Sequence, residues 1–153
     1  WTNDNPLRMQ IAELFQANLA DVGIDVAVEI LPWATYLADT ADGKHDMFIL
    51  GWVTVTGDPD YGLYALFHSS QHGNAGNRSF YTNPRVDELL DLGRSESDPE
   101  ARMAFYYEAQ ELIVEDAPWV FLIATSEVNG LRDNVTGFVP HPAGHHSLKN
   151  VTK

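Results

Sequence analysis

The chain has 153 residues, a formal net charge of −13 and no cysteine. This length suits one domain with one hydrophobic core. The acidic charge argues against nucleic acids and anionic lipid surfaces as partners, and the lack of cysteine excludes disulfides, thiol catalysis and cysteine-based zinc sites. No stretch approaches the roughly 20 apolar residues that a membrane span requires.

The first 52 residues predict an alternation of helices and strands. Apolar residues recur every three or four positions over 11–22, which is typical of an amphipathic helix. The stretch IDVAVEI, residues 24–30, alternates strictly and predicts a strand. A short helix over 33–43 and a second strand over the apolar run 46–52 follow. This order predicts an α/β fold with parallel strands.

The second half predicts two helices and one more strand. Asn-Pro and Asp-Pro pairs open helices at positions 84 and 99, and Gly93 is interpreted as the end of the first. The apolar run over 119–125 predicts a buried strand. After Thr125 the chain is polar and rich in proline and glycine.

A candidate ligand site follows the predicted strand 46–52. The loop reads GWVTVTGDPDYG, and ligands of open α/β sheets bind beyond the carboxyl ends of strands. Gly57 would let the backbone approach a ligand, and Trp52 and Tyr61 would supply flat walls. Trp33 follows another predicted strand, so it would wall the same cleft. The alternatives are a plain loop packed by aromatic residues and, for Trp33, a plug at the sheet edge.

Other polar groups offer weaker hypotheses. His68 and His72 have the spacing of a helical metal pair but stand in a loop-like stretch, so solvated surface is the favoured interpretation. The same holds for the histidines of the tail PHPAGHHS, at positions 141, 145 and 146. Asp58 and Asp60 are spaced for acid–base chemistry, but nothing else supplies a nucleophile or an oxyanion motif. Asp58 beside a glycine and a proline favours a turn.

The chain resembles family-5 extracellular solute-binding proteins of ABC transporters, most closely the App-like branch of oligopeptide binders. The likeness covers nearly the whole chain in one order. The segments that carry it are QIAELFQANLADVGIDVAVEILPWATYL, DGKHDMFILGW, GDPDYGLYALFHS, NRSFYTNPRVDELL, DPEARMAFYYEAQELIVEDAPWVFL and VTGFVPHPAG.

The resemblance implies a two-lobed clamp of which this chain is a C-terminal fragment, since family members are several times longer. Residues 1–125 would form part of a type II periplasmic-binding-protein lobe, with a mixed sheet flanked by helices. Residues 126–153 would form a return segment to the other lobe. Family members carry a signal sequence or lipobox, so the resemblance implies an extracytoplasmic protein, in the periplasm or as a lipoprotein at the outer face of the membrane.

The implied function is capture of oligopeptides or dipeptides for an ABC permease, with no catalytic residue, metal or cofactor. The alternatives are a nickel-chelate or haem carrier of the same family and, less favoured, a hydrolase. An isolated chain of this kind is expected to self-associate, because exposed apolar patches and strand edges invite contacts.

The resemblance also selects site residues. Trp33 and Trp52 match positions that line the peptide pocket in the family. Several relatives have an Asp three residues after the second Trp, where this chain has Val55; Asp58 is the nearest substitute for binding a ligand amino group. Alternatively, backbone hydrogen bonds hold the ligand like an added strand. The full predicted set is Trp33, Trp52, Val55, Thr56, Gly57, Asp58 and Tyr61.

Overall fold

The computed structural model describes residues 1–153. Its secondary structure consists of five α-helices, two very short strands and two 3₁₀ turns. In chain order these are β1 (Thr2–Asn3), α1 (Pro6–Ala20), β2 (Ile30–Leu31), α2 (Trp33–Ala41), α3 (Pro59–Phe67), η1 (Ser69–Gln71), η2 (Gly73–Ala75), α4 (Pro84–Ser95) and α5 (Pro99–Asp116).

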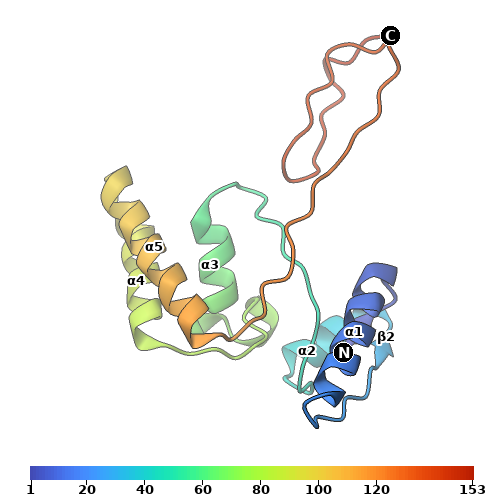
Figure 1. The fold of residues 1–153 in the computed structure, drawn as a ribbon. Helices are drawn as coiled ribbons and strands as arrows, with labels where there is room; N and C mark the ends of the chain where they lie inside the picture. Colours follow the sequence, from blue (N-terminus) through green and yellow to red (C-terminus); the bar gives the residue numbers. More distant parts are fainter.

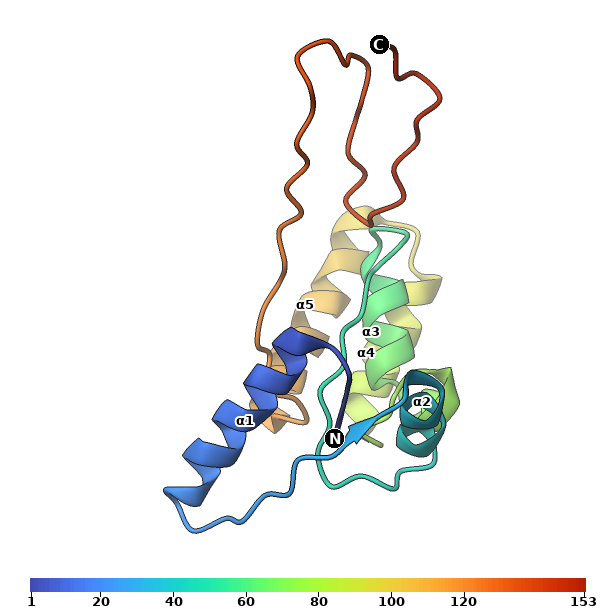
Figure 2. The same cartoon turned by 90° about the vertical axis from the view of Figure 1, so that its right-hand side faces the viewer.

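The helices form two groups, with an extended C-terminal segment beyond them. Figure 1 shows α1, α2 and the strands in one group, and α3, α4 and α5 in the other. After α5 the chain forms a long irregular segment that extends away from both groups, drawn in orange to red in Figures 1 and 2.

Four helices begin at an Asn-Pro or Asp-Pro pair, which explains where they start. In each pair the Asn or Asp side chain accepts a hydrogen bond from a backbone N–H of the first turn, and the proline needs no such partner. The starts predicted at positions 84 and 99 are confirmed. The capping residues are Asn5, Asp58, Asn83 and Asp98.

Gly93 does not end α4, so this prediction was wrong. The helix continues to Ser95, and Gly93 is buried inside it. A β-carbon at this position would lie 2.7 Å from Cζ of Tyr106, whose side chain is fully buried on α5. Glycine here therefore permits α4 and α5 to approach each other closely.

Three extended segments lie side by side with parallel backbones. Thr2 pairs with Ile30 in the parallel ladder of β1 and β2. On the other side of β1, the amino group of Trp1 donates to the carbonyl of Met47 (2.7 Å), and the amide of Ile49 donates to the carbonyl of Trp1 (3.0 Å). One residue bonded to two residues of its neighbour in this way is the pattern of parallel pairing.

The predicted strands are much shorter than the sequence suggested. Residues 24–29, 46–52 and 119–125 are not in regular strands, and the only sheet has two strands of two residues each. A strand requires a neighbour that supplies ladder hydrogen bonds along its length. The apolar patterns of these segments were identified correctly, but within this chain they have few backbone partners.

A polar loop over residues 68–82 joins α3 to α4 and contacts α2 in the other helical group. The fully buried side chain of Asn77 donates to the carbonyls of His68 and Tyr81 and accepts from the amide of Tyr81. Next to it, Arg78 donates to the carbonyl of Leu37 (2.8 Å) and to Oγ1 of Thr40 (3.4 Å), both in α2. The guanidinium therefore attaches this loop to α2.

The buried apolar core lies within the α3–α5 group. Each fully buried aliphatic or aromatic side chain there contributes roughly 1.5–3 kcal/mol. In contrast, α1 has no buried residue, and Leu14 on its apolar stripe is 61% exposed. The core cluster is Leu66, Phe67, Val86, Leu89, Leu90, Tyr106, Ala109 and Ile113.

Replacing Gly93 with alanine is expected to destabilise the protein although alanine favours helices. The added methyl group collides with the buried Tyr106 ring, and such overpacking costs about 1–3 kcal/mol, more than the roughly 1 kcal/mol gained in helix propensity. Thermal unfolding measures the change. Gly130→Ala, where no atom lies within 4 Å of the new β-carbon, is the matched control. An unchanged or raised midpoint for Gly93→Ala would contradict the packing argument.

Candidate functional site

The two tryptophans singled out in the sequence follow extended segments that run in the same direction. Trp33 opens α2 directly after β2, and Trp52 ends the segment whose residues 47 and 49 pair with Trp1. Because these segments are parallel, their carboxyl ends meet at one edge of the small sheet. Trp33 is 48% exposed and Trp52 is 39% exposed, so both present apolar surface at this edge.

Arg8, in the first turn of α1, lies near β1, the start of α2 and the segment 46–52. Its guanidinium donates to Oδ1 of Asn3 (2.9 Å) and lies 5.9 Å from the ring centre of Trp33. A β-carbon on Gly51 would lie 3.3 Å from Nη2 of Arg8, so the guanidinium also reaches the residue before Trp52. A cation near an aromatic face is attracted to it.

Trp52 and Tyr61 form an aromatic wall. Their ring centres lie 5.4 Å apart with an angle of 34° between the rings, and each residue is 39% exposed. Trp52 precedes the loop and Tyr61 belongs to the first turn of α3. The loop between them therefore begins and ends at one aromatic surface, which can cover a flat or extended ligand.

The loop between the two rings is a turn followed by a helix cap. The amide of Gly57, which has a φ of 69°, donates to the carbonyl of Thr54 (3.0 Å). The Asp58 amide donates to Oγ1 of Thr56 (3.2 Å). The carboxylate of Asp58 accepts from the amide of Asp60 (2.9 Å), as an N-cap does. The geometry agrees with the interpretation of Asp58 as a turn residue.

Asp58 also has a charged partner from a distant part of the chain. Arg102 on α5 donates from Nη2 to Oδ1 of Asp58 (2.6 Å). This hydrogen bond is the main cause that lowers the pKa of Asp58, since it stabilises the ionised carboxylate; burial, the next largest cause, acts in the opposite direction. Asp58 is therefore already engaged within the protein.

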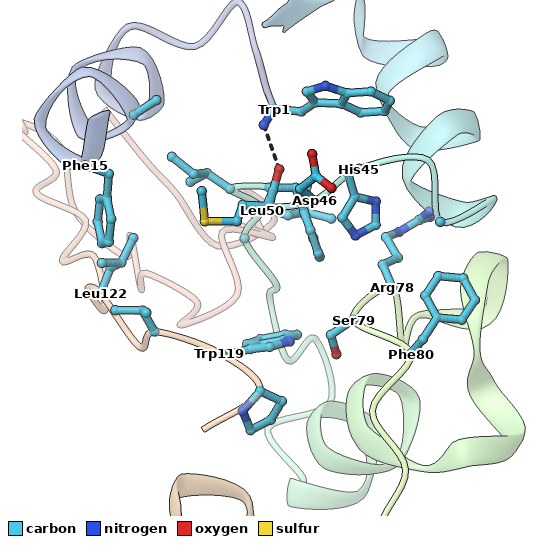
Figure 3. Close-up of a pocket in the computed structure, with 18 of the residues that line it drawn as sticks. Trp1, Phe15, His45, Asp46, Leu50, Arg78, Ser79, Phe80, Trp119 and Leu122 are labelled. Carbon is cyan, nitrogen blue, oxygen red and sulfur yellow. Dashed lines mark hydrogen bonds between the residues drawn. The ribbon is translucent and has the colours of Figure 1, made fainter. Parts of the chain in front are cut away.

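Two hollows adjoin this region. A polar one of about 440 Å³ is lined by Thr56, Asp58, Asp60, Tyr61, Arg94 and Arg102. A larger apolar one, about 540 Å³, lies between α1, the segment 46–52 and the segment that follows α5. Figure 3 shows Phe15, Trp119 and Leu122 among the side chains around it. Trp52 borders the apolar hollow, whereas Trp33 borders neither.

The structure thus brings together part of the predicted set. Thr56, Asp58 and Tyr61 line one hollow, and the Trp52 ring packs against Tyr61 at a tilt. Val55 is 39% exposed beside them. Trp33 packs instead near Tyr36, with ring centres 6.0 Å apart. Sequence reasoning missed the arginines Arg8, Arg94 and Arg102, because no local pattern indicates which distant group a guanidinium will contact.

The histidines make contacts other than metal ligation. Nδ1 of His68 accepts from the amide of Ser70 (3.0 Å), and Nε2 of His72 lies 2.9 Å from the carbonyl oxygen of Tyr81. In the tail, Nε2 of His146 lies 2.7 Å from Oε1 of Glu127. The structure contains no group of three or more His, Cys, Asp or Glu side chains placed to hold a metal ion. None of its helices is both long enough and apolar enough to span a membrane.

Comparisons with known proteins show which class of protein this chain resembles. The chain is 31% identical over 147 residues to probable di/tripeptide-binding protein 5 of Pseudomonas aeruginosa, covering 96% of this chain and 28% of that protein. It is 32% identical over 151 residues to haem-binding protein A of Haemophilus influenzae, covering 99% and 27%. The oligopeptide-binding protein AppA of Bacillus subtilis, solved with a nonapeptide, matches with a TM-score of 0.77 and 28% identity over 97% of this chain and 29% of that one.

These matches define an α/β part of an extracellular solute-binding protein, so the predicted fold class is confirmed. Residues 1–74 match the family described as bacterial extracellular solute-binding proteins, family 5 Middle. The chain belongs to this family, as the resemblance implied. It spans a little over a quarter of the length of the relatives it matches.

The contribution of the Asp58–Arg102 pair to stability should disappear in acid. The folded state lowers the pKa of Asp58, so the pair stabilises the protein above the ordinary value of 3.8 and loses this effect as the pH falls below it. The difference in unfolding midpoint between the wild type and Asp58→Asn should be constant from pH 5 to 7 and shrink below about pH 4. Carbon NMR of the carboxyl group gives the pKa directly, and a pKa that Arg102→Gln does not raise would contradict this account.

Proposed function

We propose that this chain forms part of the ligand-binding lobe of a peptide-binding protein that serves an ABC importer. The observation that carries the proposal is the shared carboxyl edge, with Trp33 and Trp52 exposed on it and the Trp52–Tyr61 wall beside it. Two of the relatives are named for binding di- or tripeptides and oligopeptides, which supports a peptide as the ligand.

The proposed organisation follows the same reasoning. Residues 1–125 contribute to one lobe, and residues 126–153 return toward the other. The second range runs away from both helical groups, with Val128 92% exposed and Val139 72% exposed, as expected of a segment that packs elsewhere (Figure 2). A clamp of two lobes closes over its ligand, and closure rather than chemistry is the functional step.

Recognition would rely on stacking and backbone contacts more than on a charge clamp. Asp58 is paired with Arg102 and caps α3, so a ligand amino group would compete with both contacts. Val55 offers no charge. Extended peptides can bind through main-chain hydrogen bonds, and an aromatic ring that covers those bonds from water strengthens them. Trp33, Trp52, Thr56, Gly57 and Tyr61 would supply these contacts.

A haem carrier is the second candidate, favoured by the similarity to haem-binding protein A over 99% of this chain. Nickel-chelate binding is the related alternative. Both the peptide and the haem function are transport roles outside the cytoplasm, in the periplasm or on a lipid-anchored protein. Titration of the full-length protein with haem, with Ni(II) and with peptides separates the three, because only one class should bind tightly.

Trp52 is expected to contribute more to peptide binding than Asp58. Truncating an aromatic anchor typically costs about 2 kcal/mol or more, so Trp52→Ala should weaken binding at least about tenfold. Asp58→Asn should leave affinity within a few-fold, because asparagine still caps a helix and its oxygen still accepts from Arg102. Isothermal titration calorimetry of the full-length protein with short peptides measures both.

Acetylated peptides provide the control for this prediction. Blocking the amino group of the ligand should change the affinity of the wild type and of Asp58→Asn to a similar extent. If Asp58→Asn abolishes binding of free peptides and spares acetylated ones, then Asp58 is the amino-group anchor and the proposed mode of recognition is wrong.

The isolated 153-residue chain is expected to self-associate. Its segment after α5 exposes consecutive apolar side chains, with Val120, Phe121 and Ile123 each more than half exposed. Unpaired extended segments and apolar patches favour contacts between copies. Sedimentation velocity over a range of concentrations should detect a dimer or larger species, and a monomer at high concentration would contradict the prediction.

A further inference from the structure

We propose that Arg102 is a positioning residue for the aromatic wall of Trp52 and Tyr61, acting through the carboxylate of Asp58. The inference rests on the proposed function in one respect, namely that this wall contacts the ligand. Arg102 itself points at Asp58 rather than at the two rings, so its effect on a ligand would be indirect.

The guanidinium of Arg102 makes several contacts with α4 and α5. Its Nε donates to the carbonyl of Gly93 on α4 (3.0 Å), and Nη2 lies 3.3 Å from the hydroxyl of Tyr106. The guanidinium also lies over the Tyr106 ring, 4.9 Å from its centre. Tyr106 is fully buried in the core between α4 and α5. The guanidinium is therefore bonded to both helices of the α4–α5 hairpin, next to a residue of the apolar core.

The other end of the contact is the cap of α3. Oδ1 of Asp58 accepts both from Nη2 of Arg102 (2.6 Å) and from the amide of Asp60 (2.9 Å). The two partners Asp58 and Arg102 are 44 residues apart in the chain. One carboxylate oxygen thus fixes where α3 begins and ties that point to α5. Charge-assisted hydrogen bonds of this kind are short and strong.

Short stretches of backbone connect Asp58 to both rings of the aromatic wall, Trp52 and Tyr61. In one direction, the Asp58 amide bonds to Thr56 and the adjacent turn closes on Thr54, two residues after Trp52. In the other direction, Tyr61 stands within the first turn of α3 and packs against Trp52. Movement of Asp58 would therefore displace both rings, since each is linked to it through a few residues of ordered backbone.

A second arginine clamps the same turn. Nε of Arg94, on α4, lies 3.1 Å from Oδ1 of Asp60, and its guanidinium lies 3.9 Å from the ring centre of Tyr64. The two acids of the sequence Asp58-Pro59-Asp60 are thus each paired with an arginine of the α4–α5 hairpin. The Arg94–Asp60 contact is an ion pair without a hydrogen bond, so Arg94 contributes its charge and its position over the Tyr64 ring. The motif fastens α3 to the hairpin.

Arg85 offers a matched control on the same hairpin. It pairs with Glu88 (2.8 Å) and Glu108 (2.7 Å), and all three side chains are about half exposed. Its charged contacts join α4 to α5 alone and include no residue of α3 or of the wall. Arg85→Gln therefore removes ion pairs of similar length without touching the cap of α3.

The experiment uses the full-length protein labelled with 5-fluorotryptophan, together with Arg102→Gln, Arg102→Lys, Asp58→Ala, the double variant Arg102→Gln/Asp58→Ala, and Arg85→Gln. The ¹⁹F resonance of Trp52, assigned with Trp52→Phe, reports on the wall without any ligand. Calorimetry with a short peptide series reports on binding. Unfolding midpoints confirm that each variant is folded at the temperature used.

Arg102→Gln should shift or broaden the Trp52 resonance and weaken peptide binding about three- to tenfold, less than the loss of a charge-assisted hydrogen bond to the ligand itself, because the arginine acts on the ligand indirectly. Arg102→Lys should restore part of both effects, because lysine keeps the charge but not the planar group. Asp58→Ala also removes the cap of α3, so it should weaken binding at least as much as Arg102→Gln, and the double variant should be no worse than Asp58→Ala alone. Arg85→Gln should change neither measurement.

Two results would overturn the proposal. One is an unchanged Trp52 resonance in Arg102→Gln, since the wall would then be independent of the arginine. The other is an equal effect of Arg85→Gln, which would indicate a general loss of stability in the hairpin. If the wild type binds no peptide, the proposed function is wrong, and the Trp52 resonance alone decides whether Arg102 positions the wall.

Discussion

The polar loop over residues 68–82 is the contact on which the arrangement of the whole chain depends. The apolar core lies within α3–α5, and α2 meets that group through this loop. Gly73 and Gly76 let the loop approach the carbonyls of Ala41 and Ala65, where a β-carbon would lie only 2.6 and 2.4 Å from the oxygens. Buried polar groups are stable only when they are hydrogen-bonded, so the bonds of this loop set how the two groups face each other.

The sequence predicted four of the five helices, missed α3 (Pro59–Phe67) because its start was interpreted as a loop, and predicted the strands poorly. A helix bonds to itself, and its first turn is capped by the residue just before it, as Asn83 and Asp98 do here. A strand bonds to another segment that sequence patterns do not identify. The run 46–52 has the composition of a buried strand, yet its backbone bonds in this chain are chiefly those between Trp1 and residues 47 and 49.

The candidate site also has features that the sequence predicts and features that it does not. Trp33 and Trp52 were predictable because each follows an extended segment, and parallel segments bring such residues to one edge. Neither the packing of Trp52 against Tyr61 nor the pairing of Asp58 with Arg102 has a local signal in the sequence, the latter because 44 residues separate the partners. Gly93 was misread for the same reason, since its neighbour Tyr106 belongs to the next helix.

Arginine side chains make several of the contacts between separate elements of this acidic protein. Arg8 lies near β1, the start of α2 and the segment 46–52, Arg78 binds α2, and Arg102 links α5 to α4 and α3. Arg102 donates from Nε and Nη2 to three partners and lies over the Tyr106 ring, and Arg8 combines one hydrogen bond with a position near the Trp33 ring. A planar guanidinium can stack and donate at once, which a lysine cannot do. The chain has 22 acidic and only nine basic residues. Its arginines therefore hold elements in position as well as offsetting negative charge. The position of the Trp52–Tyr61 wall therefore depends on contacts between separate elements. Some of the residues that make these contacts, such as Arg102, would not touch a ligand.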